Sequence, residues 1–305
     1  MKLFERIFVI VVGTLVVSAI LTPLVYSGAV SIWTPFPWPF SRVFDRVAMV
    51  VLAGFLVWYR RAFRLERLLA LLRSDGFPTA FARVLLGMIV TFSMSIILLP
   101  YIVDGVALQW KDQAVHGFGM RLLKVVPAAL LISVIEESFF RVILFLSLRA
   151  SFGGIAAGIV SSILYAFAHF ITPAKDWIYP GLSPTVGFAY LGEVCQRLAL
   201  PGVLEAGIGL FLVGCVLCFA MWRVRSVWLC IGFHAGWVIA VKLTGYFTIQ
   251  GPNFEFAAGA GRRYFLVSQP EAWVSVASVA LFVLVYALIA KVKPQEELGS
   301  SDIDE

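Results

Sequence analysis

The chain has 305 residues, of which 61% are hydrophobic and 14% charged, and its formal net charge is +6 at pH 7. Soluble globular proteins contain about 45–50% apolar and about 25% charged residues. This composition therefore excludes an ordinary soluble enzyme, a disordered chain and a nucleic-acid-binding domain. A lipid bilayer is the solvent that can cover so much apolar surface, so we expect an integral membrane protein.

Eight segments are apolar and long enough to cross the roughly 30 Å core of a bilayer as helices. In chain order they are Ile7–Tyr26, Val43–Trp58, Val84–Val103, Val125–Leu148, Phe152–Ile171, Val203–Trp222, Val227–Leu243 and Trp273–Ala290. The sequence thus predicts an all-α, polytopic bundle of about eight transmembrane helices. The first segment is longer than the apolar part of a signal peptide, so we expect an uncleaved anchor.

Loop charges predict the orientation of the chain under the positive-inside rule. Lys2 and Arg6 precede the first span, and an arginine-rich loop from Arg60 to Arg83 follows the second. Both termini are therefore expected in the cytoplasm, in the plasma membrane or in a bacterial inner membrane. Leucines in 65–72 recur at helical spacing among the arginines, which favours a helix on the membrane surface. The acidic end, 296–305, is expected to be a disordered tail.

The fourth predicted span carries charges that a membrane helix rarely contains. It holds two adjacent carboxylates, Glu136 and Glu137, followed by Arg141. Each charged group costs about 2.5–3.5 kcal/mol at the centre of a bilayer on insertion scales. Glu137 and Arg141 are spaced i, i+4, so they are expected to pair. Glu136 points about 100° away on a helix and is expected to lack that partner.

The charged cluster has a structural and a functional interpretation. An ion pair that fixes helix packing explains Glu137 and Arg141, but not the second glutamate. A carboxylate without a cation beside it is suited to act as a general base. Two histidines, His169 and His234, lie in other predicted spans. A convergent site of Glu136 with these histidines is one possibility, and two separately packed histidines is the other.

Several known intramembrane chemistries do not fit these groups. None of the histidines begins an HExxH zinc motif, and the GxGD aspartyl-protease and rhomboid GxSG signatures are absent from the sequence. Glu136 and two histidines on different helices remain.

The arrangement resembles the CPBP family of CAAX proteases and bacteriocin-processing enzymes, also called the Abi or Ras-converting-enzyme family. The family signature is EExxxR on one helix, FxxxH on the next and a later HxxxN. The first is complete from Glu136 to Arg141, and the second occurs with tyrosine in place of phenylalanine, from Tyr165 to His169. The third begins at His234, but Val238 stands where the family has asparagine. The resemblance covers about 125–243.

The resemblance implies an intramembrane endopeptidase with a metal-free, glutamate-activated water. Glu136 would activate the water with help from His169, and His234 would bind the developing oxyanion. Glu137 and Arg141 would support the helix. No cofactor is favoured by this interpretation, but two histidines and a glutamate could instead hold zinc. Val238 cannot donate a hydrogen bond, and loss of one oxyanion donor costs about 10²–10³ in rate.

The expected partners are the lipid bilayer and a membrane-associated protein or peptide, either CAAX-type or carrying a C-terminal sorting tail. Nucleic acid is not expected. On this basis we divide the chain into N-terminal membrane helices (1–120), a catalytic membrane core (121–245), and a last helix with the tail (246–305). Two other functions stay open. One is a catalytically inactive, CPBP-like binding or immunity protein, and the other is a small transporter coupled to protons through Glu136.

Overall fold

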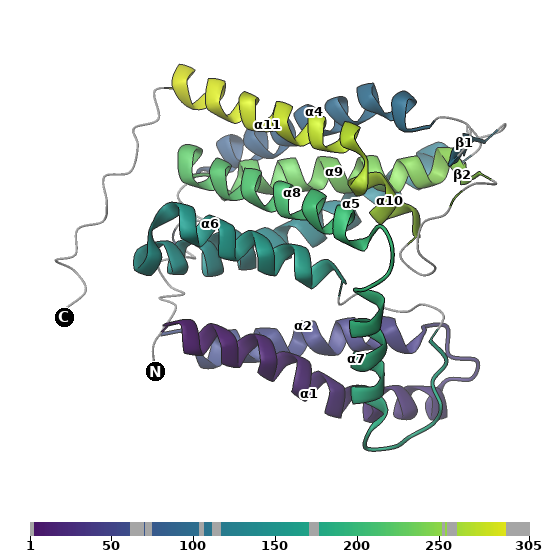
Figure 1. The fold of residues 1–305 in the computed structure, drawn as a ribbon. Helices are drawn as coiled ribbons and strands as arrows, with labels where there is room; N and C mark the ends of the chain where they lie inside the picture. Colours follow the sequence, from purple (N-terminus) through teal and green to yellow (C-terminus); the bar gives the residue numbers. More distant parts are fainter. Residues whose placement is uncertain are drawn as a thin grey trace. The chain divides into compact units, whose positions relative to one another are not determined.

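The computed structural model describes residues 3–61, 70, 75–103, 107–111, 117–170, 177–251, 254 and 261–290. The chain divides into two compact units. The first comprises Met1–Glu66, Phe167–Leu204 and Ala257–Gly259, and the second comprises Arg67–Ala166, Glu205–Phe256 and Ala260–Glu305. Within the described residues, helices dominate both units and two three-residue strands form the only ladder (Figure 1). The predicted all-α helical bundle is confirmed.

The first unit is built from α1 (Leu3–Ile32), α2 (Phe40–Trp58) and the short α7 (Val186–Arg197). Both α2 and α7 contact α1. Its core is aromatic, with Phe40, Phe44 and Tyr190 fully buried and in ring contact with one another. Bulky rings at these positions supply the van der Waals contact that holds helices together where lipid removes the hydrophobic driving force.

The second unit is centred on α9 (Val227–Phe247), which contacts α4 (Phe77–Ile102) and α5 (Phe118–Glu137) (Figure 1). Helices α4 and α9 meet backbone to backbone. A Cβ atom on Gly87 would lie 2.8 Å from the Leu229 carbonyl oxygen, and one on Gly236 would lie 2.6 Å from the Met88 carbonyl oxygen. Thr91 fastens the crossing by donating its hydroxyl to the Phe233 carbonyl at 2.9 Å. At these two glycines the backbones of α4 and α9 therefore approach each other directly.

A π-helix, η1 (Ser138–Phe145), continues directly from α5 and leads into α6 (Leu146–Phe170). A turn at Gly153, where φ is 77°, interrupts α6. It falls between the predicted fourth and fifth spans. Beyond the turn, α6 packs on α8 (Val203–Val224) through small residues. A Cβ atom on Gly154 would lie 3.5 Å from the Trp222 ring, and one on Gly158 would lie 3.9 Å from Cys218.

Four shorter or peripheral elements complete the second unit. Strands β1 (Leu108–Trp110) and β2 (Thr248–Gln250) pair antiparallel, with Gln109 opposite Ile249. Helix α10 (Gly261–Ser268) contacts α9, and α11 (Pro270–Ile289) packs on α4. The ladder extends α9 beyond its helical end and closes one end of the unit.

Five helices in the described part of the chain are long and apolar enough to cross a membrane: α1, α4, α8, α9 and α11. The protein is a multi-pass membrane protein, as expected. The other three predicted spans lie in α2, in α5 with η1, and in α6, and their crossing of the membrane stays a prediction. The orientation and the three-part division also stay predictions. The leucine-rich surface helix and the acidic tail fall outside the described residues.

Candidate active site

One stripe of α5 leads to the charged cluster. Val125 and Ala129, spaced i, i+4, pack with Ala235 and Ile239 of α9 in an apolar cluster. Two turns further along the same stripe lies Glu137, which is fully buried at the end of the helix. Because this stripe faces α9 along its length, the carboxylate of Glu137 also lies against α9.

Glu137 is bonded on both of its oxygens. Its Oε2 accepts a hydrogen bond from Arg141 Nε at 2.8 Å, and its Oε1 lies 2.9 Å from His234 Nδ1. The Glu137 and Arg141 side chains are both 0% exposed. A buried carboxylate is tolerated where a cation and hydrogen bonds compensate for the lost water. The ion pair expected from the i, i+4 spacing is present, and Glu137 additionally holds the imidazole of His234.

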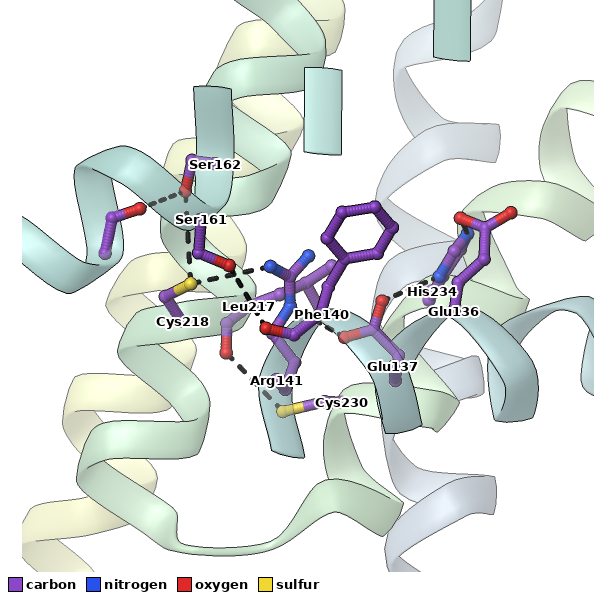
Figure 2. Close-up of polar contacts among 11 residues, drawn as sticks. Glu136, Glu137, Phe140, Arg141, Ser161, Ser162, Leu217, Cys218, Cys230 and His234 are labelled. Atoms are coloured by element: carbon purple, nitrogen blue, oxygen red, sulfur yellow. Dashed lines mark hydrogen bonds and ion pairs between the residues drawn. The ribbon is translucent and has the colours of Figure 1, made fainter. Parts of the chain in front are cut away.

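Glu136 lies on the other side of the same imidazole. Its Oε2 is 3.8 Å from His234 Nε2, and its side chain is 23% exposed, unlike that of Glu137. As expected from the helical spacing, Arg141 pairs with Glu137 and not with Glu136, and α9 brings His234 next to Glu136. His234 stands between two carboxylates, one deeply buried and one partly accessible (Figure 2).

Arg141 lies inside the π-helix and is enclosed by three elements. Besides Glu137, its Nη1 lies 3.5 Å from the sulfur of Cys218 on α8. On α6, the ring of Tyr165 lies 4.8 Å from the guanidinium carbon. The expected regular helix across 125–148 is wrong at this point, because eight residues after Glu137 adopt π geometry. Wide π turns are rare and are found mostly at functional sites.

Two neighbours of the charged cluster were not singled out by sequence reasoning for this role. Tyr165 lies edge-on to the His234 ring, with the two centroids 6.0 Å apart, as well as over Arg141. Its place in the Tyr165-to-His169 motif was the available signal. Cys218 carried no such signal, because an apolar stretch with a CxxC pattern favours simple packing.

The structure brings together four of the five predicted site residues: Glu136, Glu137, Arg141 and His234. The fifth, His169, lies half-buried in the last turn of α6 and belongs to the first unit. Val238 lies one turn after His234 on α9 and packs in the apolar cluster of α5 and α9. The position that carries asparagine in the family thus has an apolar environment here.

No group of three or more His, Cys, Asp and Glu side chains in the described part of the chain is arranged to hold a metal ion. His234 and Glu136 could supply two ligands, whereas catalytic zinc usually has three from the protein.

Comparison with known proteins finds one family that part of the chain resembles. Residues 118–240 match the model of the type II CAAX prenyl endopeptidase Rce1-like family. No curated protein and no solved structure matches the chain. The matched region contains α5, η1, α6 and most of α9, and therefore the whole His234 network. Over this region the chain is similar to the CPBP family of CAAX-type intramembrane endopeptidases.

Proposed function

We propose that the protein hydrolyses a peptide bond of a membrane-associated protein with a water molecule activated by Glu136. The observation that carries the proposal is the position of His234 between Glu137 and Glu136. Arg141 neutralises the charge of Glu137, and the role of Glu137 is then to orient the imidazole ring of His234. Glu136 is left as the more accessible carboxylate, and a general base must be reachable by water and substrate.

In the proposed first step, the Glu136 carboxylate takes a proton from the water as the oxygen attacks the peptide carbonyl carbon. The carbonyl oxygen becomes an oxyanion. His234 enters this step as an imidazolium, with Nδ1–H donating to Glu137 and Nε2–H donating to the oxyanion. Glu136 then gives its proton to the departing amine nitrogen, and the carbon–nitrogen bond breaks. Every proton is returned, so the enzyme is unchanged after one turnover.

His169 is proposed to assist Glu136 by holding the attacking water. This role is taken from the family's FxxxH pattern, which His169 completes four residues after Tyr165. Val238 cannot act as the family asparagine does, because its side chain has no hydrogen-bond donor. It packs among apolar side chains instead. We infer that oxyanion stabilisation depends more heavily on His234 in this protein than in relatives that retain the asparagine.

The proposed substrate is a membrane-anchored protein that presents an extended segment to the helical bundle, of the CAAX type or with a C-terminal sorting tail. The family match supports a CAAX-type reaction in general. A substrate delivered by the membrane reaches a site between helices without crossing bulk water, which suits a site whose residues are this strongly buried.

The test is terminal mapping of the membrane proteome in the native host. Cells that produce wild type, Glu136→Gln or Glu193→Gln at equal levels are compared. Glu193 is a matched control, because it belongs to an i, i+4 pair with Arg197 that is partly exposed on α7. Uncut precursors should accumulate with Glu136→Gln alone. Identical termini in all three strains would refute the proposed peptidase.

Zinc catalysis is the chemical alternative, and it is tested on the purified protein. Glutamate-activated water predicts full cleavage after treatment with a chelator and substoichiometric zinc by elemental analysis. Loss of cleavage on chelation, with recovery on adding Zn²⁺ and about one ion per chain, would replace the proposed mechanism.

A membrane binding protein of the same fold is the second candidate function. The observation that favours it is the apolar packing of Val238, which removes one oxyanion donor. The two functions differ in the response to Glu136→Gln. A peptidase stops cleaving its substrate, whereas a binding protein still captures the uncut partner in both forms and never generates a new terminus.

A further inference from the structure

The π-helix η1 fixes where Arg141 stands, so whatever holds η1 also shapes the His234 network. A π turn has one more residue per hydrogen-bonded ring than an α turn, and it is the less favourable conformation. Within the second unit, η1 begins immediately after Glu137 and includes Arg141. A relaxation to α geometry would rotate Arg141 around the helix axis, relative to the carboxylate that it neutralises.

Helix α6 contacts η1 through two residues on one face. The hydroxyl of Ser161 donates to the backbone carbonyl of Phe140 at 3.1 Å (Figure 2). One turn later on α6, the ring of Tyr165 lies 4.8 Å from the guanidinium carbon of Arg141. Ser161 is 0% exposed, so no water competes for this bond. A carbonyl oxygen accepts two hydrogen bonds, and a side-chain donor can therefore stabilise a turn whose own bonding is strained.

We propose that Ser161 is a positioning residue for the reaction. It lies outside the EExxxR and histidine motifs, and it acts through the backbone of η1. Its hydroxyl keeps the turn at Phe140 in π geometry, which holds Arg141 against Glu137 and thereby holds the His234 ring in register with Glu136. The inference rests on the proposed function for its kinetic consequence, but its structural consequence is independent of catalysis.

The neighbouring serine provides a matched control. Ser162 is as buried as Ser161, but its hydroxyl donates within α6, to the Gly158 carbonyl at 2.7 Å, and lies 3.9 Å from the sulfur of Cys218 on α8. On a substrate identified by terminal mapping, Ser161→Ala should lower kcat about tenfold with KM changed less than twofold. Ser161→Thr keeps the hydroxyl and should stay within about threefold of wild type, as should Ser162→Ala.

A spectroscopic readout separates this inference from the proposed function. Protein labelled with 15N-histidine is purified in detergent, and the ring signals of His234 are assigned by their loss in His234→Asn. Ser161→Ala should shift these signals, because the Glu137 contact at Nδ1 changes, whereas Ser162→Ala should leave them in place. The readout needs no substrate, so it works even if the wild type cleaves nothing.

Three results would overturn the inference. The first is an unshifted His234 spectrum in Ser161→Ala, and the second is an equal shift in Ser162→Ala. The third is an equal loss of kcat in Ser161→Ala and Ser161→Thr. A shifted spectrum in a protein without peptidase activity would refute the proposed function while supporting the positioning role of Ser161.

Discussion

Replacing Arg141 with methionine tests whether the buried ion pair is needed by Glu137. The change keeps an unbranched side chain but removes the cation at Oε2 of the fully buried Glu137, whose Oε1 keeps its contact with His234. Breaking a buried pair by removing one partner costs about 3–5 kcal/mol, because an uncompensated charge remains. Arg141→Met should therefore lower the free energy of unfolding by about that amount. The double variant with Glu137→Gln should recover about 2 kcal/mol or more, since no lone carboxylate remains.

The same spacing on the protein surface supplies the control. Glu193 and Arg197 form an i, i+4 pair with an Nε–Oε1 distance of 3.0 Å, but the two side chains are 34% and 23% exposed. Arg197→Met should cost about 0.3–0.5 kcal/mol, as exposed helical pairs do. The assay is urea unfolding in detergent micelles, followed by tryptophan fluorescence. Equal losses for Arg141→Met and Arg197→Met would show that burial does not make the difference, and the reasoning would fail.

Two further changes test the packing and the altered motif. Gly236→Ala would drive a methyl group into Thr91 and the Met88 carbonyl, so it should destabilise the protein by about 1–3 kcal/mol in the same assay. Gly192→Ala is the control, because a methyl group there meets open space and should leave the stability nearly unchanged. Equal losses of stability in the two variants would contradict the close crossing of α4 and α9. Val238→Asn should cost about 1–3 kcal/mol of stability, because a polar amide enters an apolar cluster. If the position still faces the reacting carbonyl, it should also raise kcat in the cleavage assay by about 10-fold or more, and unchanged kcat would show that position 238 has left the site.

Local spacing was sufficient to predict part of the site. The Glu137–Arg141 pair follows from i, i+4 geometry, which depends on one helix alone. The partner of Glu136 could not be predicted in the same way, because it depends on how deeply α9 places His234. That placement is decided by the glycine contacts of α4 with α9, which are long-range in sequence.

The helix type after Glu137 and the start of α4 could not be predicted from the sequence, because both depend on contacts with residues outside the apolar run. The π turn after Glu137 has no signature in an apolar stretch, because the contact that stabilises it comes from Ser161, 21 residues after Phe140. The fourth predicted span lies in α5 and η1, and its second half is a π-helix that the apolar pattern did not predict. The start of α4 was also predicted late, at Val84, because Arg83 ended the apolar run. In the structure Arg83 lies within α4 and is paired with Asp75.

The glycine crossing of α4 and α9 restricts how this protein can change shape. Because the backbones meet at Gly87 and Gly236, a rotation of α9 about its own axis would bring it into collision with α4. His234 therefore lies on a helix that α4 holds in a fixed orientation within the second unit. If the site adjusts when a substrate binds, the movement must come from η1, which can change from π-helical to α-helical geometry.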